Sequence, residues 1–194
     1  MRTPDPSLEQ LRLRLTKLLP SAISFSGQGF RSTTPKYATE TDLLTGEGSK
    51  RYGGRWNPPG IAVIYASLSP ETAMAESLAH HRYYGLPVED AMPRTFVAID
   101  ADLHHVLDFR DGQIRKRLQV SEERILTIDW RRELQTGHQP ITHTIGRAAY
   151  EIGWEGVIVP SAAHSSGHNL LVFPDNLQSI SRIAVQNPNR LETP

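Results

Sequence analysis

The apolar positions at the start of the chain recur with a helical period. Five leucines fall on one face of such a helix: Leu8, Leu11, Leu15, Leu18 and Leu19. Ser7 stands three residues before Gln10, which is the spacing of a capping box, and Pro20 ends the pattern. We therefore expect an amphipathic helix in residues 1–21 that packs on the rest of the domain, with docking to a partner as the alternative.

Short apolar runs rich in β-branched residues predict strands along the rest of the chain. They lie in residues 61–67, 95–100, 156–162, 169–175 and 180–186, and residues 22–38 are expected to form strand and loop, centred on ISFSGQGFRS. Because these strands come in clusters, they predict an α+β domain in residues 22–186, built on a mixed or antiparallel β core with flanking helices. The last residues, 187–194, are expected to form a frayed tail.

Helices are expected between these strands. One begins after the N-cap Ser69, with proline at its first position, and stops at Gly85. Residues 111–135 are expected to be helical in pieces, and another helix is expected near residues 145–152. Residues 39–60 are rich in turn-forming residues and are expected to be irregular, a kind of segment that often carries function.

The amino-acid composition argues against several classes of protein and site. The 194 residues suffice for one domain, and 21 Lys and Arg balance 21 Asp and Glu, so the chain lacks the basic excess of a general nucleic-acid binder. No apolar stretch could cross a bilayer, and we expect a cytoplasmic protein without membrane attachment. The absence of cysteine excludes disulfides and thiolate nucleophiles. Among the eight histidines, His164 and His168 could converge on a metal ion, but the Ser165-Ser166-Gly167 spacer between them suggests a loop, so no metal is expected.

A basic, glycine-rich segment carries most of the candidate chemistry. Lys50, Arg51 and Arg55 cluster beside Gly53 and Gly54. Glycine lets the backbone approach a ligand closely, and guanidinium groups suit bidentate recognition of phosphate. The segment therefore predicts a docking place for an anionic nucleotide.

Two further residues follow that segment. Tyr65 shares a strand face with Ile61 and Val63 by alternation, and Glu76 lies in the middle of the next helix, on a face of small residues. Taken alone, a tyrosine at this place is more often a core residue and a glutamate more often a solvated one. Their order after the arginines and glycines favours a functional site.

The same stretch resembles the RES-domain family, which comprises toxins of RES–Xre toxin–antitoxin modules. The specific element is GGRWNPPG, followed by a strand with a tyrosine and then SPETAMAE. Supporting elements follow in the family's order over roughly residues 30–183: FRS (30–32), DWR (129–131), GVIVPSA (156–162) and NLLVF (169–173).

The resemblance implies an ADP-ribosyltransferase-like fold and an enzyme that takes NAD⁺ as its substrate and destroys it, without a metal. It also implies an Xre-type, helix-turn-helix antitoxin as partner, and leaves a homodimer open. By motif, the implied catalytic residues are Glu76, Arg55 and Ser161, and the implied NAD⁺-binding residues are Arg31, Arg55, Tyr65 and Asn169.

The chemistry of the residues agrees with this reaction. Cleaving the nicotinamide–ribose bond expels a neutral pyridine, so the leaving group needs no proton, whereas ordinary glycoside cleavage uses a pair of carboxylates. One carboxylate, Glu76, could therefore suffice by stabilising the oxocarbenium charge.

Three alternatives stay open at this point. The acceptor could be water or phosphate, giving NAD⁺ hydrolysis or phosphorolysis. The enzyme could instead transfer ADP-ribose to a macromolecule. The chain could also be a non-catalytic module that binds NAD or a partner.

Overall fold

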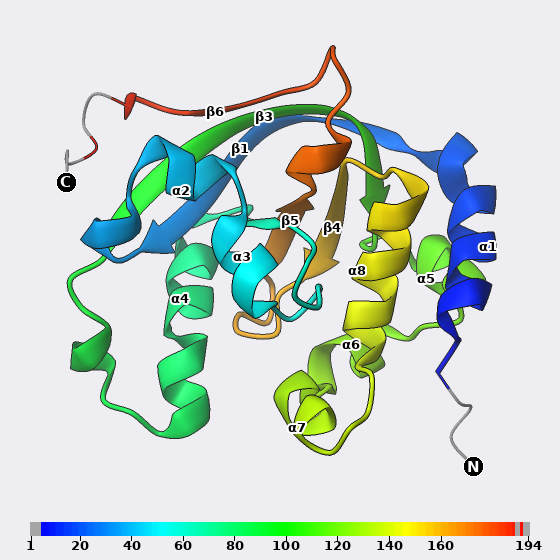
Figure 1. Cartoon of the computed structure of the whole chain (residues 1–194), viewed down its shortest axis with the longest axis horizontal. Helices are drawn as coiled ribbons and strands as arrows, with labels where there is room; N and C mark the ends of the chain where they lie inside the picture. The colour runs from blue at the N-terminus through cyan, green and yellow to red at the C-terminus, as the bar shows by residue number, and fades with distance from the viewer. Residues whose placement is uncertain (1–4, 189–190, 192–194) are drawn as a thin grey trace.

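The computed structural model describes residues 5–188 and 191 (Figure 1). Its strands are β1 (Ile23–Thr33), β2 (Ile64–Ser67), β3 (Thr95–Asp108), β4 (Gly156–Pro160), β5 (His168–Val172) and β6 (Arg182–Val185). Its α-helices are α1 (Leu8–Leu18), α2 (Glu40–Leu44), α3 (Glu47–Tyr52), α4 (Pro70–Tyr84), α5 (Gly112–Leu118), α6 (Glu122–Thr127), α7 (Trp130–Gln135) and α8 (Ile141–Ile152).

The strands form one mixed sheet in the order β1-β2-β5-β4-β3-β6, and β1 also pairs with β3. The β3–β4 pairing is parallel, and the other pairings are antiparallel. In Figure 1 the long strands β1 and β3 arch over the shorter β4 and β5, with α4 on one side and α8 and α1 on the other. The predicted α+β class with a mixed β core is confirmed.

Two hydrophobic clusters hold these layers together. The first joins one face of β2, β4 and β5 to α1, α5, α6 and α8, and includes the fully buried Trp154 and Phe173. The second lies between β3 and the opposite face of β2, β4 and β5, and includes Leu103 and Ile158. Burying both faces of the short strands explains why their sequences read as continuous apolar runs.

Helix α1 lies within the segment 1–21 for which a helix is predicted, and the helix predicted from Pro70 onward is α4. Ser7 and Gln10 form the capping box of α1, whose leucines pack into the first cluster. In α4, the Ser69 side chain accepts a hydrogen bond from the Thr72 amide. The C-cap Gly85 adopts a left-handed conformation, which glycine takes without strain.

Other boundaries differ from the sequence-based predictions. Residues 39–60 contain the short helices α2 and α3, because Thr39 caps the first and Gly46, with a φ of 66°, turns the chain into the second. The strand predicted at 95–100 extends to Asp108, since it pairs with β1 along most of its length and with β4 at its end.

The predicted tail lies largely outside the described residues, which omit 189–190 and 192–194. Within it, Leu191 packs against the second hydrophobic cluster. Over the part of the chain that is described, no helix is long and apolar enough to span a membrane.

Candidate active site

Helix α4 presents one face toward the ends of β2 and β5. Thr72, Glu76 and Tyr83 share this face, because residues four and seven apart lie on the same side of a helix. The small residues around Glu76 let the helix approach the sheet closely, and Ala73 is buried there. The carboxylate of Glu76 is thus aimed at the sheet instead of bulk solvent.

Glu76 is the centre of a polar cluster that we call the Glu76 cluster: Glu76, Ser161, Asn169 and Ser67. The Ser161 hydroxyl and the Asn169 side-chain amide each donate a hydrogen bond of 2.6 Å to Oε1 of Glu76. The Asn169 side-chain oxygen accepts a 2.7 Å bond from the Ser67 hydroxyl. Three of the predicted site residues, separated by up to 93 positions in the sequence, therefore meet.

Ser161 is held in place by the loop that follows it. It is only 2% exposed, and its hydroxyl oxygen accepts hydrogen bonds of 3.1 Å from the backbone amides of Ala163 and His164. Because both amides donate, the hydroxyl proton is left for Glu76. The His164 ring is tied to the Thr72 hydroxyl of α4 at 2.8 Å, which joins this loop to the helix that carries Glu76.

The second carboxylate oxygen of Glu76 remains available to a ligand. No described residue donates a hydrogen bond to Oε2, and this atom is not among the buried polar atoms without a partner. One oxygen is thus fixed by two donors while the other faces outward. This arrangement can accept a hydrogen bond from a ligand hydroxyl and place a negative charge beside it.

Arg55 lies within electrostatic range of Glu76. Its Nη2 donates to the carbonyl oxygens of Ile125, at 2.6 Å, and Leu126, at 3.1 Å. Burial lowers the pKa of Arg55 below its ordinary value; the charge of Glu76 opposes this shift, and that of Arg131 adds to it. The guanidinium is therefore oriented by backbone carbonyls, which leave its positive charge unneutralised.

Tyr65 links the glycine-rich segment to β2. Its hydroxyl donates to Oδ1 of Asn57 at 2.7 Å and accepts from the Trp56 amide at 2.9 Å. Burial raises the pKa of Tyr65, so the hydroxyl stays protonated. A Cβ on Gly54 would lie 2.5 Å from this hydroxyl oxygen, so the close approach requires glycine. With its hydroxyl satisfied, Tyr65 can offer a ligand only its ring.

The other basic residues predicted for the site lie elsewhere. Arg31 shares a face of β1 with Phe25, which packs on the second cluster, and its guanidinium donates to the Leu43 carbonyl. Burial lowers the pKa of Arg31 to about 10. Lys50 is exposed, and Arg51 pairs with Glu47 on the surface of α3. The structure therefore brings Arg55 to the Glu76 cluster, but it does not bring Arg31, Lys50 or Arg51 there.

Among the described residues, no three His, Asp or Glu side chains are grouped so as to hold a metal ion. Several histidines are engaged in hydrogen bonds instead. His104 contacts the Ser181 hydroxyl at 3.1 Å, and His105 contacts the Gln178 side chain. The absence of a metal from the reaction stays a prediction.

Sequence reasoning missed two residues that shape the site. Ser67 orients the Asn169 amide, and its place two positions after Tyr65 on β2 was an available signal. His143 of α8 is 1% exposed and its Nε2 lies 2.7 Å from the Gly54 carbonyl oxygen, so Nε2 carries the proton. No local pattern pointed to His143, because its partner is 89 positions away.

The mixed sheet, in the order β1-β2-β5-β4-β3-β6 and flanked by helices, has an ADP-ribosyltransferase-like fold. The RES domain model matches residues 29–192, and the chain belongs to the RES domain family. The resemblance noted from GGRWNPPG and SPETAMAE is thereby confirmed.

Individual relatives agree with this assignment. The chain is 32% identical over 124 residues to the NAD(+) phosphorylase MbcT of Mycobacterium tuberculosis, a match covering 62% of each chain. It is 41% identical over 59 residues to the Prs ADP-ribosylating toxin of a Sphingobium species, covering 30% of this chain and 37% of the toxin. In the M. tuberculosis MbcT–MbcA toxin–antitoxin complex, one chain superposes with a TM-score of 0.69 at 25% identity, covering 92% of this chain and 90% of that one.

Proposed function

We propose that this protein is the toxin of a toxin–antitoxin module and depletes NAD⁺ by cleaving the bond between nicotinamide and ribose. The observation that carries the proposal is the state of Glu76, whose Oε1 is fixed by Ser161 and Asn169 while Oε2 stays available. The likeness to MbcT, named as an NAD(+) phosphorylase, supports the same reaction.

In the proposed reaction, Glu76 accepts a hydrogen bond from a ribose hydroxyl and stabilises the charge that develops at the anomeric carbon. The carbon–nitrogen bond breaks, and its electron pair neutralises the pyridinium, so nicotinamide leaves without a proton. Fixed dipoles and charges of this kind are the largest contribution in many enzymes. Arg55 holds an anionic part of NAD⁺, and the Tyr65 ring packs beside the nicotinamide.

Phosphate is the acceptor that we propose. One of its oxygens forms the new bond to the anomeric carbon, and the released proton passes to solvent, giving phosphorylated ADP-ribose and nicotinamide. Transfer of ADP-ribose to a protein is a second candidate, favoured by the likeness to the Prs ADP-ribosylating toxin. Binding to an Xre-type antitoxin in the cytoplasm, and an NAD⁺ site that includes Asn169, belong to this proposal, whereas Arg31, which faces the second hydrophobic cluster, is left out of that site.

The test is incubation of the purified protein with NAD⁺ labelled in the adenosine half, with and without phosphate, followed by chromatography. We expect nicotinamide release together with phosphorylated ADP-ribose when phosphate is present. Free ADP-ribose in both reactions would identify water as the acceptor. Label retained on protein would identify a transferase. Intact NAD⁺ under all conditions would refute the proposal.

A further inference from the structure

Arg131 of α7 is a charged residue with no role in the proposed reaction. Its guanidinium carbon lies 4.3 Å from the ring centre of Trp130 and 4.9 Å from that of Tyr83 on α4. No described residue forms an ion pair or a hydrogen bond with its side chain. Aromatic faces hold the group in place while leaving its hydrogen-bond donors free.

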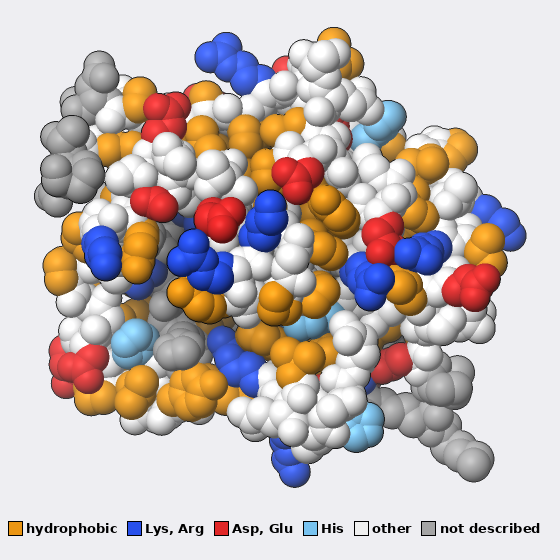
Figure 2. Space-filling model, in the orientation of Figure 1, with side chains coloured by type: hydrophobic (Ala, Val, Ile, Leu, Met, Phe, Trp, Pro, Cys, Tyr) orange, Lys and Arg blue, Asp and Glu red, His pale blue; other side chains and the backbone are white. Residues whose placement is uncertain are grey.

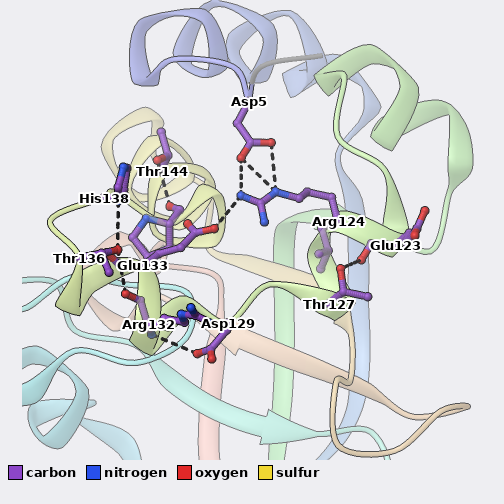
Figure 3. Close-up of polar contacts among 12 residues, drawn as sticks. Asp5, Glu123, Arg124, Thr127, Asp129, Arg132, Glu133, Thr136, His138 and Thr144 are labelled. Atoms are coloured by element: carbon purple, nitrogen blue, oxygen red, sulfur yellow. Dashed lines mark hydrogen bonds and ion pairs between the residues drawn. The ribbon is translucent and has the colours of Figure 1, made fainter. Parts of the chain in front are cut away.

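The helix that carries Arg131 is anchored on both sides (Figure 3). The Asp129 side chain caps α7 by accepting from the Arg132 amide at 3.1 Å, and it also accepts from the Tyr83 hydroxyl at 3.0 Å. From the other side, Arg124 joins Glu133 of α7, at 2.9 Å, to Asp5, at 2.6 Å. Arg131 is therefore presented from a fixed backbone toward the face of α4 that also carries Glu76.

A second set of contacts brings Arg131 near Arg55. The Trp130 ring lies 5.7 Å from the His143 ring, and His143 donates to the carbonyl of Gly54, the residue before Arg55. The charge of Arg131 lowers the pKa of Arg55, which agrees with this proximity. Figure 2 shows basic side chains on the face between the regions of α4 and α7. Two like charges held this close favour an anion beside them, although Glu76 and Asp129 also lie near enough to raise the pKa of Arg55.

We propose that Arg131 and Arg55 together form a phosphate-binding pair at the entrance to the Glu76 cluster, with Arg131 donating to phosphate oxygens of the ligand. This inference rests on the proposed function for the identity of the ligand. The phosphate group is either the pyrophosphate of NAD⁺ or the inorganic phosphate that accepts ADP-ribose. An arginine stacked on two rings loses little freedom on binding, which suits it to this role.

The test measures binding apart from turnover. Inorganic phosphate and ADP are titrated calorimetrically into the wild type, Arg131→Gln, Arg131→Lys and the matched control Arg132→Gln. Arg132 is the neighbouring residue on α7, and its exposed side chain forms no ion pair or hydrogen bond with any described residue. Thermal unfolding of each variant shows whether α7 is still folded.

We expect Arg131→Gln to weaken binding of one of the two probes by about 10-fold or more, the loss that follows from removing a charge-assisted hydrogen bond. Arg131→Lys retains part of the affinity because the charge remains, and Arg132→Gln matches the wild type. Weaker ADP binding assigns Arg131 to the pyrophosphate, and weaker phosphate binding assigns it to the acceptor. In kinetics, KM for the corresponding substrate rises while kcat changes little.

The inference is overturned if Arg131→Gln and Arg132→Gln bind both probes equally, or if the wild type binds neither. Failure of the proposed function gives a different result. In that case the wild type leaves NAD⁺ intact, while the titrations still report whether Arg131 contributes to anion binding.

Discussion

Replacing Glu76 with glutamine removes one negative charge from the site while keeping the shape of the side chain. The hydrogen-bond directions are defined, because Ser161 and Asn169 both donate to Oε1. The glutamine oxygen can take the place of Oε1 and keep both bonds. Its amide nitrogen then replaces Oε2, so a hydrogen-bond donor faces the ligand where an acceptor stood.

The size of the effect follows from Coulomb's law. A unit negative charge about 4 Å from a developing positive charge contributes about 4 kcal/mol at an effective dielectric constant near 20. Losing this electrostatic stabilisation of the transition state corresponds to a decrease of about 1,000-fold in kcat. The fold is expected to remain intact, because glutamine is as compatible with a helix as glutamate.

The assay is nicotinamide release from NAD⁺ under saturating substrate, with thermal unfolding measured on the same preparations. Glu71→Gln is the matched control, an exposed glutamate on the first turn of the same helix. We expect Glu71→Gln to keep wild-type turnover. If Glu76→Gln unfolds normally and keeps more than about one tenth of the wild-type kcat, the electrostatic role assigned to Glu76 is wrong.

Three further changes test other parts of the site. Arg55→Ala is expected to raise KM for NAD⁺ by about 10-fold, the loss of one charge-assisted hydrogen bond; unchanged kcat and KM would mean that Arg55 does not contact the substrate. Gly54→Ala places a methyl group against the Tyr65 hydroxyl and is expected to cost about 1–3 kcal/mol of unfolding free energy, measured by denaturant titration. Gly48→Ala, with open space around it, should not lower stability beyond a few tenths of a kcal/mol. Burial lowers the pKa of His143, so the unfolded chain binds its proton more readily and stability falls as pH drops through about 6.5. His143→Gln should flatten that part of the stability–pH profile, and an identical slope in both proteins would refute the assignment.

Much of the fold could be predicted from local patterns. The capping box at Ser7, the proline at the first position of α4 and the stop at Gly85 each act within a few residues, so the sequence alone identifies them. Apolar runs located the strands for the same reason. The lengths of the strands could not be predicted in this way, because β3 continues to Asp108 only through its pairing with β1 and, at its end, with β4.

The candidate site, too, could be predicted only in part from the sequence. Glu76, Ser161 and Asn169 could be named from motifs in the right order, and the structure brings them into one cluster. Arg31 and Arg55 could not be told apart by sequence, since each is an arginine near a predicted strand. The sheet separates them: Arg31 turns toward the second hydrophobic cluster, while Arg55 binds the end of α6 beside Glu76.

The sequence by itself determined the residue types, their order and most of the helices and strands, because these depend on spacing over a few positions. Only the tertiary structure decided which polar groups meet. The bonds from Ser161 and Asn169 to Glu76 span 85 and 93 positions, and the bond from Ser67 to Asn169 spans 102. Such contacts depend on the order of the strands in the sheet and on which face of each strand is buried. The residue pattern of a single segment predicts neither the strand order nor the buried face.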